Sequence, residues 1–519
     1  MTTPLRLADL LAGLSMVADL GYGLPMGEAT RSCLIGVALA RRLGLADHEV
    51  ADTFYTSLLL HVGCVGFSHE MSTHFGDENT ANRAGARTNF ADPRDVMATL
   101  VPQATRGLPP PARIKAAVFI ATRGRALGRQ YDTTVCEVGR ETARRIGLPD
   151  GVQRALYEAK EWWNGGGTPR GLKGEKIVVP ARIARVAAEA ALFSDLGGVQ
   201  LAVHALSRRG GGMLDPAIVA AFTADPSILA EADAGDPRQR ILDEEPAPVV
   251  EKSLAGLPQL AAAFGDLADL KTPFTHGHSK EVARLAKAAA ETLGMESHAV
   301  QRLHVAAFLH DLGRVGVSNS VWEKSGPLTS ADWEQVRLHP YHSERILAMS
   351  EVLEPMARIV GLHHERLDGS GYHRGCRGRD LPAAARVLAA ADAFQAMIET
   401  RPHRQAFTPK DAGQELARDA KAGRLDPEAV GAVIEAADQK RAVRRRDLRP
   451  GGLSAREIEV LRLVSRACSN REIAEQLYIS RRTAEHHVQH VYTKIGVSSR
   501  SAAALFAMEH DLLPPSSEV

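Results

Sequence analysis

The chain is constrained most strongly by a series of histidines and aspartates that stand at the ends of apolar segments. The apolar run Ala-Ala-Phe-Leu leads directly into His310-Asp311, and Val-Leu-Ala-Ala-Ala leads into Asp392. Polar groups on buried helices are costly unless they are paired or bind an ion. The pattern therefore predicts helices that converge on a metal site. The alternative is that each of these side chains is separately a hydrogen-bonded core residue or a solvated surface residue. The complete series is His278, His310, Asp311, His339, His363, His364 and Asp392.

The densest part of the series is His363-His364-Glu365, which a glycine-rich turn, Asp368-Gly-Ser-Gly-Tyr372, follows closely. By itself, an adjacent histidine pair is typical of a solvated surface helix. Together with the rest of the series it favours metal binding. Imidazole and carboxylate ligands favour Fe, Mn, Zn or Co over Mg or Ca.

Residues 271 to about 432 resemble the HD-GYP phosphodiesterases, a branch of the HD metal-hydrolase superfamily. The matching segments occur in the family's order along the whole module: His278–Ala283, His310-Asp311 with Leu-Gly-Arg-Val-Gly, His339-Pro340, His363–Glu365, Asp368–Tyr372, Ala391-Asp392, Arg401–Arg404 and Leu425–Pro427. The resemblance implies an all-helical domain that hydrolyses cyclic di-GMP at a two- or three-metal site, where the ions stabilise charge on the phosphate.

The resemblance also implies roles for individual residues. One metal would be held by His278, His310, Asp311 and Asp392, and the second by the bridging Asp311 with His339, His363 and His364. We expect Fe or Mn at both positions, with Zn, Co or Ni as alternatives, and catalytic roles for Asp311 and Arg314. Glu365 is expected to orient one histidine ligand through its other ring nitrogen. The expected substrate-binding residues are Gly369, Gly371, Tyr372, Arg401 and Arg404.

Three positions depart from the family pattern. His373 stands where the glycine-tyrosine-proline run has proline, and Arg314 stands in place of a lysine. An arginine contacts phosphate but cannot donate a proton near neutral pH. Phe274 replaces the glutamate of three-metal members, so we expect two ions. Two alternatives to a cyclic di-GMP phosphodiesterase stay open: a weak or inactive nucleotide sensor, and a hydrolase of another nucleotide.

The final 67 residues predict a helix-turn-helix, since Ser454 and Ser469 each begin a Ser-x-x-Glu capping box and Ser480 caps a third helix. The buried side of the third helix is expected to carry Ala484, Val488, Val491 and Ile495, and the opposite side Arg482, His486, Gln489, His490 and Thr493. A small protein-interaction module is the alternative that this pattern leaves open.

The sequence of this segment closely resembles the LuxR-type DNA-binding domain. The resemblance runs from Leu-Ser-Ala-Arg-Glu to Tyr-Thr-Lys-Ile-Gly-Val-Ser-Ser-Arg. By that resemblance Thr483 and Lys494 contact DNA phosphates, while Arg482, His486 and Gln489 face the major groove and set the preferred promoter sequence. The last helix, Arg500–His510, is expected to form a homodimer surface.

The N-terminal half is predicted to be a degenerate repeat of the second half. Tyr55–Gly66 matches the His-Asp segment, Lys160–Gly171 matches His364–Gly375, and Leu214–Pro216 matches Leu425–Pro427. The ligand residues are lost from this half, with His61 as the one exception. The replacements are Val62, Glu28, Ala159, Lys160 and Ala188. We therefore expect a structural, dimerising or ligand-sensing role for it.

These patterns predict an all-α chain of two tandem HD-type modules and a small helix-turn-helix domain. The expected boundaries are 1–231 for the degenerate module, 232–256 for a linker, 257–439 for the metal-hydrolase module, 440–452 for a basic linker and 453–519 for the DNA-binding domain. The scattered cysteines Cys33, Cys64, Cys136, Cys376 and Cys468 favour a reducing compartment. The sequence has no continuous apolar run of membrane-spanning length. We therefore expect a cytoplasmic bacterial regulator that binds promoter DNA and cyclic di-GMP and does not bind a membrane.

Overall fold

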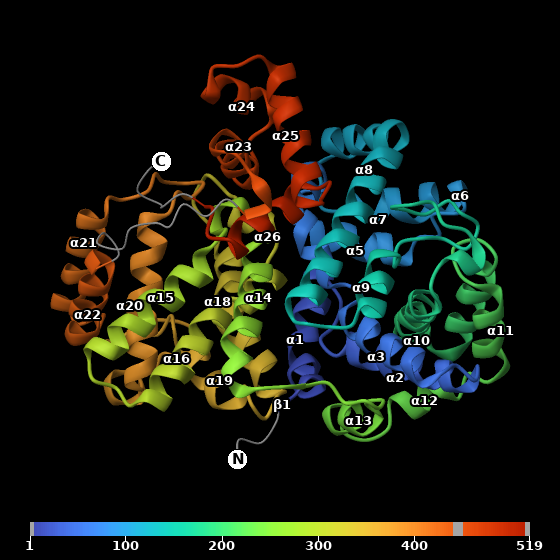
Figure 1. Cartoon of the computed structure of the whole chain (residues 1–519), viewed down its shortest axis with the longest axis horizontal. Coiled ribbons are helices and arrows are strands. Elements are labelled where there is room, and N and C mark those ends of the chain that lie inside the picture. Colours follow the sequence, from blue (N-terminus) through green and yellow to red (C-terminus); the bar gives the residue numbers. More distant parts are fainter. Residues whose placement is uncertain (1–4, 440–449, 514–519) are drawn as a thin grey trace. The chain divides into compact units, whose positions relative to one another are not determined.

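The computed structural model describes residues 5–439 and 450–513, and their regular secondary structure is almost entirely helical, as the sequence predicts. Within the described ranges, the strands are β1 (Leu5–Arg6) and β2 (Glu251–Lys252), which pair antiparallel with Leu5 opposite Lys252. The chain divides into two compact units, Met1–Leu254 and Ala255–Val519 (Figure 1). Residues 440–449, most of the predicted basic linker, lie outside the described residues.

The first unit is built from helices of very different lengths. They are α1 (Leu7–Tyr22), α2 (Glu28–Arg42), α3 (Asp47–Leu59), η1 (Val62–Phe67), α4 (Ser68–Phe75), α5 (Glu78–Arg87), α6 (Pro93–Asp95), η2 (Val96–Leu100), α7 (Val101–Ala104), α8 (Pro110–Arg145), α9 (Asp150–Tyr157), η3 (Gly174–Lys176), α10 (Val179–Arg209), α11 (Pro216–Ala224), α12 (Ile228–Ala232) and α13 (Pro237–Glu244). Helix α10 contains a kink at Gly197 and Gly198.

The stretch 232–256, which was predicted to be a linker, contains ordered elements of the first unit. Helix α13 buries Ile241 completely, and β2 pairs with β1. Glu245 is also buried: it accepts a hydrogen bond from the Tyr55 hydroxyl at 2.6 Å and forms an ion pair with Arg6 at 2.7 Å. The polar, acidic composition of this stretch does not indicate these buried contacts. The linker prediction is therefore wrong for most of residues 232–256.

The second unit begins at Ala255, within η4 (Leu254–Gly256). Its HD-type module comprises α14 (Leu257–Asp269), η5 (Pro273–Thr275), α15 (His278–Thr292), α16 (Ser297–Leu309), η6 (Leu312–Gly316), α17 (Asn319–Trp322), α18 (Ser330–Ala348), α19 (Glu354–Gly361), η7 (Gly378–Asp380), α20 (Ala383–Ile398), α21 (Pro409–Lys421) and α22 (Pro427–Gln439). After η9 (Pro450–Gly452) come α23 (Ala455–Ser465), α24 (Asn470–Leu477), α25 (Arg481–Ile495) and α26 (Arg500–Glu509).

One glycine in each unit allows a close backbone approach. A Cβ atom on Gly63 would lie 2.0 Å from the carbonyl oxygen of Val135 on α8, and one on Gly313 would lie 2.1 Å from that of His339 on α18. Each glycine follows a buried helix, α3 or α16, and lets a short 3-10 helix approach a neighbouring backbone. Each unit therefore contains a close contact of this kind, at Val135 in the first unit and at His339 in the second.

Two helical stretches, 47–75 and 179–209, are long and apolar enough to cross a membrane by length and composition. The first is 83% buried inside the first unit, and the second is 39% buried. Core helices of globular proteins meet the same criterion, so the two stretches are weak evidence for membrane insertion.

Candidate metal centre and nucleic-acid interface

The predicted metal ligands come from five helical segments of the second unit. His278 is the first residue of α15, His310-Asp311 joins α16 to η6, and Asp392 lies within α20. His339 lies within α18, immediately before Pro340, and His363-His364 follows the end of α19. All seven side chains are buried or nearly so, with His364 the most exposed at 19%.

Asp311 lies at the centre of this cluster. Its Oδ2 atom lies 3.6 Å from Nε2 of His278 and 3.4 Å from Nε2 of His310. Its Oδ1 atom lies 3.3 Å from Nε2 of His339 and 3.7 Å from Nε2 of His363. One carboxylate therefore faces two pairs of histidines, one pair with each oxygen.

Asp392 faces the same centre from α20. Its Oδ1 atom lies 3.2 Å from Nε2 of His278, and its Oδ2 atom lies 3.8 Å from Nδ1 of His364. Within the described part of the chain, three groups of side chains are close enough to hold a metal ion, and all of them belong to this cluster. They are His339, His363 and His364; His278, His310 and Asp392; and His310, Asp311 and His363.

Backbone carbonyl groups fix the orientation of three imidazole rings. Nδ1 of His310 donates to the carbonyl of Ala307 at 2.7 Å; the rings of His339 and His363 make the same bond with the residue three positions earlier, at 2.6 and 2.5 Å. A proton on Nδ1 leaves the Nε2 lone pair free. The Nε2 atoms of His278 and His310 are buried without a hydrogen-bond partner, so the donor set fits divalent transition-metal ions.

The electrostatics of two of these residues, His363 and Asp311, also favour ligation. Burial, with smaller contributions from the charges of His310 and His339, lowers the pKa of His363 to about 3. Burial alone would raise the pKa of Asp311, but His310 and Arg314 hold it well below the ordinary range. Near neutral pH the imidazole of His363 is therefore neutral and the carboxyl group of Asp311 is ionised, which are the forms that bind metals.

Glu399, which sequence reasoning missed, orients His278. Its Oε1 atom lies 3.0 Å from Nδ1 of His278, on the opposite edge of the ring from the Nε2 atom that faces Asp392. Gln395 and Arg401 hold the carboxylate in place with hydrogen bonds of 2.8 and 2.6 Å. No local sequence signal marks Glu399, which directly follows the last residue of the apolar helix α20.

The orienting role predicted for Glu365 is wrong. Its two carboxylate oxygens accept the backbone N–H groups of Arg374 and Cys376, at 2.6 and 3.0 Å. In the first unit, Glu161 accepts the backbone N–H groups of Arg170 and Leu172 in the same way, at 2.6 and 2.8 Å. In both units, therefore, a glutamate anchors the loop that follows it.

The predicted catalytic and substrate-binding arginines are all engaged within the protein. Arg314 donates to Oδ2 of Asp311 at 2.8 Å, and its guanidinium lies 4.2 Å from the ring centre of Trp322. Arg401 pairs with Glu399, while Arg404 donates to the backbone carbonyls of Met397 and other nearby residues. Arg314 therefore lies at the metal cluster, and Arg404 stabilises a turn.

The glycine-rich turn brings Tyr372 to the metal cluster. The Tyr372 ring stacks on His364, with 4.7 Å between ring centres and an angle of 25° between planes. A Cβ atom on Gly371 would lie 2.5 Å from the carbonyl oxygen of His364, and Gly369 has a φ of +81°. Glycine is therefore required at both positions so that the backbone can follow the path that positions Tyr372.

In the first unit, an ammonium group lies among aromatic side chains. Lys160 lies over the rings of Tyr22 and Tyr131, with 5.5 and 5.8 Å to their centres, and His61 stacks on Tyr22 at 4.3 Å. Lys160 and His61 therefore both contact the ring of Tyr22.

The C-terminal domain has the predicted capping and burial. Ser454 and Ser469 form capping boxes with Glu457 and Glu472, and Ser480 caps α25 through the backbone N–H of Thr483. On α25 the residues Ala484, Val488 and Val491 are buried and Ile495 is partly buried, whereas Arg482, Thr483, His486, Gln489, His490, Thr493 and Lys494 are exposed. Lys494 already pairs with Glu457 at 2.7 Å, so a phosphate contact would have to share or replace that pair.

Comparisons with known proteins agree with this architecture. Residues 263–429 match the HD domain family, and residues 452–507 match the bacterial regulatory proteins of the luxR family. The chain is 30% identical over 434 residues to 3'3'-cGAMP-specific phosphodiesterase 3 of Vibrio cholerae, covering 83% of this chain and 94% of the relative. A cyclic di-GMP phosphodiesterase of Thermotoga maritima is 34% identical over 184 residues, covering 35% of this chain and 50% of the relative.

A solved structure extends this likeness to the fold. The crystal structure of a cyclic GMP-AMP specific phosphodiesterase of V. cholerae matches 84% of this chain and 98% of its own length, with 27% identity and a TM-score of 0.59. The helical fold and the His/Asp cluster define an HD-domain phosphodiesterase. This chain belongs to that family, and it carries a C-terminal LuxR-type helix-turn-helix domain.

Proposed function

We propose that the second unit is a metal-dependent phosphodiesterase that hydrolyses a cyclic dinucleotide with two divalent ions, Fe or Mn. The position of Asp311 carries this proposal, because its two oxygens face different histidine pairs and suit a ligand shared by two ions. The ions would supply Lewis-acid stabilisation of the attacking and leaving oxygens when bound. Relatives named as acting on cyclic di-GMP and on 3'3'-cGAMP support the substrate class.

The chain's own residues would orient the substrate and neutralise its charge. The buried guanidinium of Arg314, which contacts Asp311, is placed beside the cluster where it would meet a phosphate oxygen. It would serve as a fixed positive charge, because arginine keeps its proton near neutral pH. Tyr372, stacked on His364, would close one side of the reaction space and exclude water.

The experiment compares hydrolysis of cyclic di-GMP and 3'3'-cGAMP by protein loaded with Fe or Mn and by the same protein treated with chelator. We expect turnover by loaded protein only, and chromatography of the products separates linear dinucleotide from mononucleotide. Loaded protein that hydrolyses neither compound, nor any other cyclic dinucleotide, would contradict the proposal.

Nucleotide sensing without turnover is the second candidate function. The ion pair between Arg314 and Asp311 favours it, because the two proposed catalytic side chains are bound to each other. Protein that binds cyclic dinucleotide at equilibrium, keeps its metal and gives no product would support this candidate over the first.

The exposed face of α25 supports sequence-specific binding to promoter DNA, with Arg482, His486 and Gln489 reading bases and Thr483 contacting a phosphate. We propose that the protein acts as a dimer and that nucleotide occupancy changes operator affinity. Such coupling is reciprocal, so DNA must change nucleotide affinity by the same factor. Operator titrations with and without a slowly hydrolysed cyclic di-GMP analogue test it; equal affinities would mean that the two activities are independent.

The first unit fits a degenerate HD-type module with a structural or ligand-sensing role. The equivalent close contacts of Gly63 and Gly313 and the equivalent loop bonds of Glu161 and Glu365 support this. The DNA-binding domain supports a cytoplasmic location.

A further inference from the structure

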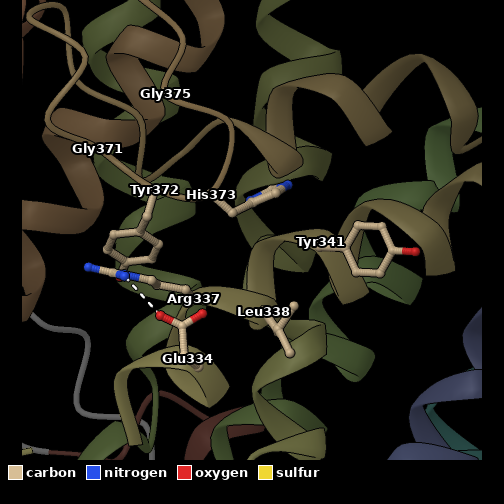
Figure 2. Close-up of a pocket in the computed structure, with 8 residues that line it drawn as sticks. All are labelled: Glu334, Arg337, Leu338, Tyr341, Gly371, Tyr372, His373 and Gly375. Atoms are coloured by element: carbon tan, nitrogen blue, oxygen red, sulfur yellow. Dashed lines mark hydrogen bonds and ion pairs between the residues drawn. The ribbon is translucent and has the colours of Figure 1, made fainter. Parts of the chain in front are cut away.

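A pocket of about 540 Å³ opens between α18 and the glycine-rich loop that follows the metal-ligand pair. Helix α18 contributes one wall and the loop contributes the other (Figure 2). The lining residues are Glu334, Arg337, Leu338 and Tyr341 from α18, and Gly371, Tyr372, His373 and Gly375 from the loop. A volume of this size is within the range of sites that bind small organic ligands.

Tyr372 connects the pocket to the metal cluster. Its ring stacks on the imidazole of His364 and also lines the pocket. In Figure 2 the tyrosine reaches from the loop toward Arg337 and Glu334. A ligand whose phosphate lies at the His/Asp cluster would therefore place the group attached to that phosphate within reach of this pocket.

The side chains around the pocket are suited to a flat aromatic ligand. Trp333, Leu338 and Tyr341, on or beside the pocket face of α18, remain 42%, 46% and 36% exposed. Trp333 meets the ring of Tyr372 edge-on at 6.5 Å. Purine bases in single-stranded nucleic acids are bound by stacking on such rings, at about 1–3 kcal/mol per base.

The polar group of the pocket is an ion pair. Arg337 donates to Oε1 of Glu334 at 3.0 Å from the next turn of α18, and the two side chains are 50% and 72% exposed. A carboxylate offers two acceptors side by side, which match the N1–H and 2-amino donors of guanine. The guanidinium offers donors for the O6 acceptor of guanine. Adenine would instead place its N1 acceptor against the carboxylate.

We propose that this pocket binds one purine base of the substrate and that Glu334, with Arg337, selects guanine over adenine. The proposal rests on the function proposed above and specifies which base is read. His373 adds a feature particular to this chain, because it lines the pocket where the family motif has proline. Its ring meets that of Tyr341 edge-on, with 6.1 Å between ring centres.

The test is Glu334→Gln, which exchanges one acceptor for a donor and so matches the adenine edge. Each protein is assayed on cyclic di-GMP, 3'3'-cGAMP and cyclic di-AMP, and the result is the ratio of kcat/KM values within that protein. This ratio cancels a change at the metal centre that affects all substrates equally. We expect wild type to favour cyclic di-GMP over cyclic di-AMP and Glu334→Gln to reduce that preference by roughly fivefold to tenfold. The matched control is Glu428→Gln, an exposed glutamate on α22, which should keep the wild-type ratio.

A second measurement does not require turnover. Calorimetric titration with GMP and with AMP should give a preference for GMP in wild type that is lost in Glu334→Gln. If no cyclic dinucleotide is hydrolysed, the proposed function fails, and this titration still decides the pocket's role. An unchanged substrate ratio in an active Glu334→Gln protein, or equal GMP and AMP binding in wild type, would overturn the guanine assignment.

Discussion

Oε1 of Glu399 lies 3.0 Å from Nδ1 of His278, so a buried carboxylate holds the imidazole whose Nε2 atom faces Asp392. Such a contact fixes the ring and makes the ligand nitrogen more basic. Glu399→Gln should therefore weaken metal binding by about tenfold to a hundredfold. Metal retained during dialysis against a graded series of chelator concentrations measures the change. Glu428→Gln serves as the control, and equal retention by all three proteins would refute this role for Glu399.

Glu161 and Glu365 each accept two hydrogen bonds from backbone N–H groups of a loop, so replacing either glutamate should destabilise its loop locally. Glutamine can accept only one of the two backbone N–H groups that each glutamate accepts, and the lost charge-assisted bond should cost about 1–3 kcal/mol of local stability. Hydrogen exchange should quicken at Arg374 and Cys376 in Glu365→Gln, and at Arg170 and Leu172 in Glu161→Gln. Protection that stays at the wild-type level in both variants would contradict this account.

The buried carboxyl group of Glu28 predicts a pH-dependent stability. Burial, followed by the charges of Asp195 and Asp19, raises the pKa of Glu28 from 4.5 to about 8. Between these values the folded state holds a proton that the unfolded state has released, so this group lowers the free energy of unfolding as pH rises, and the loss is complete above pH 8. Below pH 4.5 both states are protonated and the effect vanishes.

Glu28→Gln removes this penalty. The variant should be more stable than wild type by roughly 2–4 kcal/mol at pH 8.5, with a much smaller difference at pH 5. Urea unfolding of both proteins at the two pH values measures the difference. A gain of the same size at both pH values would show that ionisation of Glu28 is not the cause.

The exposed face of α25 predicts two classes of DNA-binding variant. Gln489→Ala should change which operator sequence is preferred, at a cost of about 1–3 kcal/mol for a base contact. Thr483→Ala and Lys494→Ala should weaken binding to all duplexes equally, and Lys494→Ala should also flatten the salt dependence. Titrations of a specific and a random duplex at two salt concentrations separate the classes. If the three variants behave alike, the orientation of α25 on DNA is misassigned.

The convergence of the proposed ligands could be predicted from sequence, because most of them stand at a helix end or, like His339, beside a proline, and Asp392 follows an apolar run. His310-Asp311 ends an apolar helix before a glycine, and the structure brings it together with His278, His339 and Asp392 as expected. The burial of α25 was predictable for a similar reason, because helical periodicity alone determines which side is apolar.

Contacts between residues distant in sequence could not be predicted in this way. Glu399 reaches His278 across 121 positions, and nothing local distinguishes it from an ordinary polar residue at a helix end. Glu365 was misassigned because its neighbours are ligands, although its carboxylate turns toward backbone N–H groups of the following loop. The acidic stretch that contains α13 reads as a linker in the sequence, because its anchors are isolated residues, such as Ile241 and Glu245, whose partners lie far away along the chain.

The metal content of Asp311→Asn tests the central claim most directly. Wild-type protein purified with Fe or Mn should contain two ions per chain by elemental analysis, since Asp311 faces both histidine pairs. The variant should lose both ions and all cyclic dinucleotide hydrolysis while it keeps operator binding. His61→Ala, the matched control in the first unit, should retain two ions. Two ions per chain in Asp311→Asn would contradict the assignment of this carboxylate as the shared ligand.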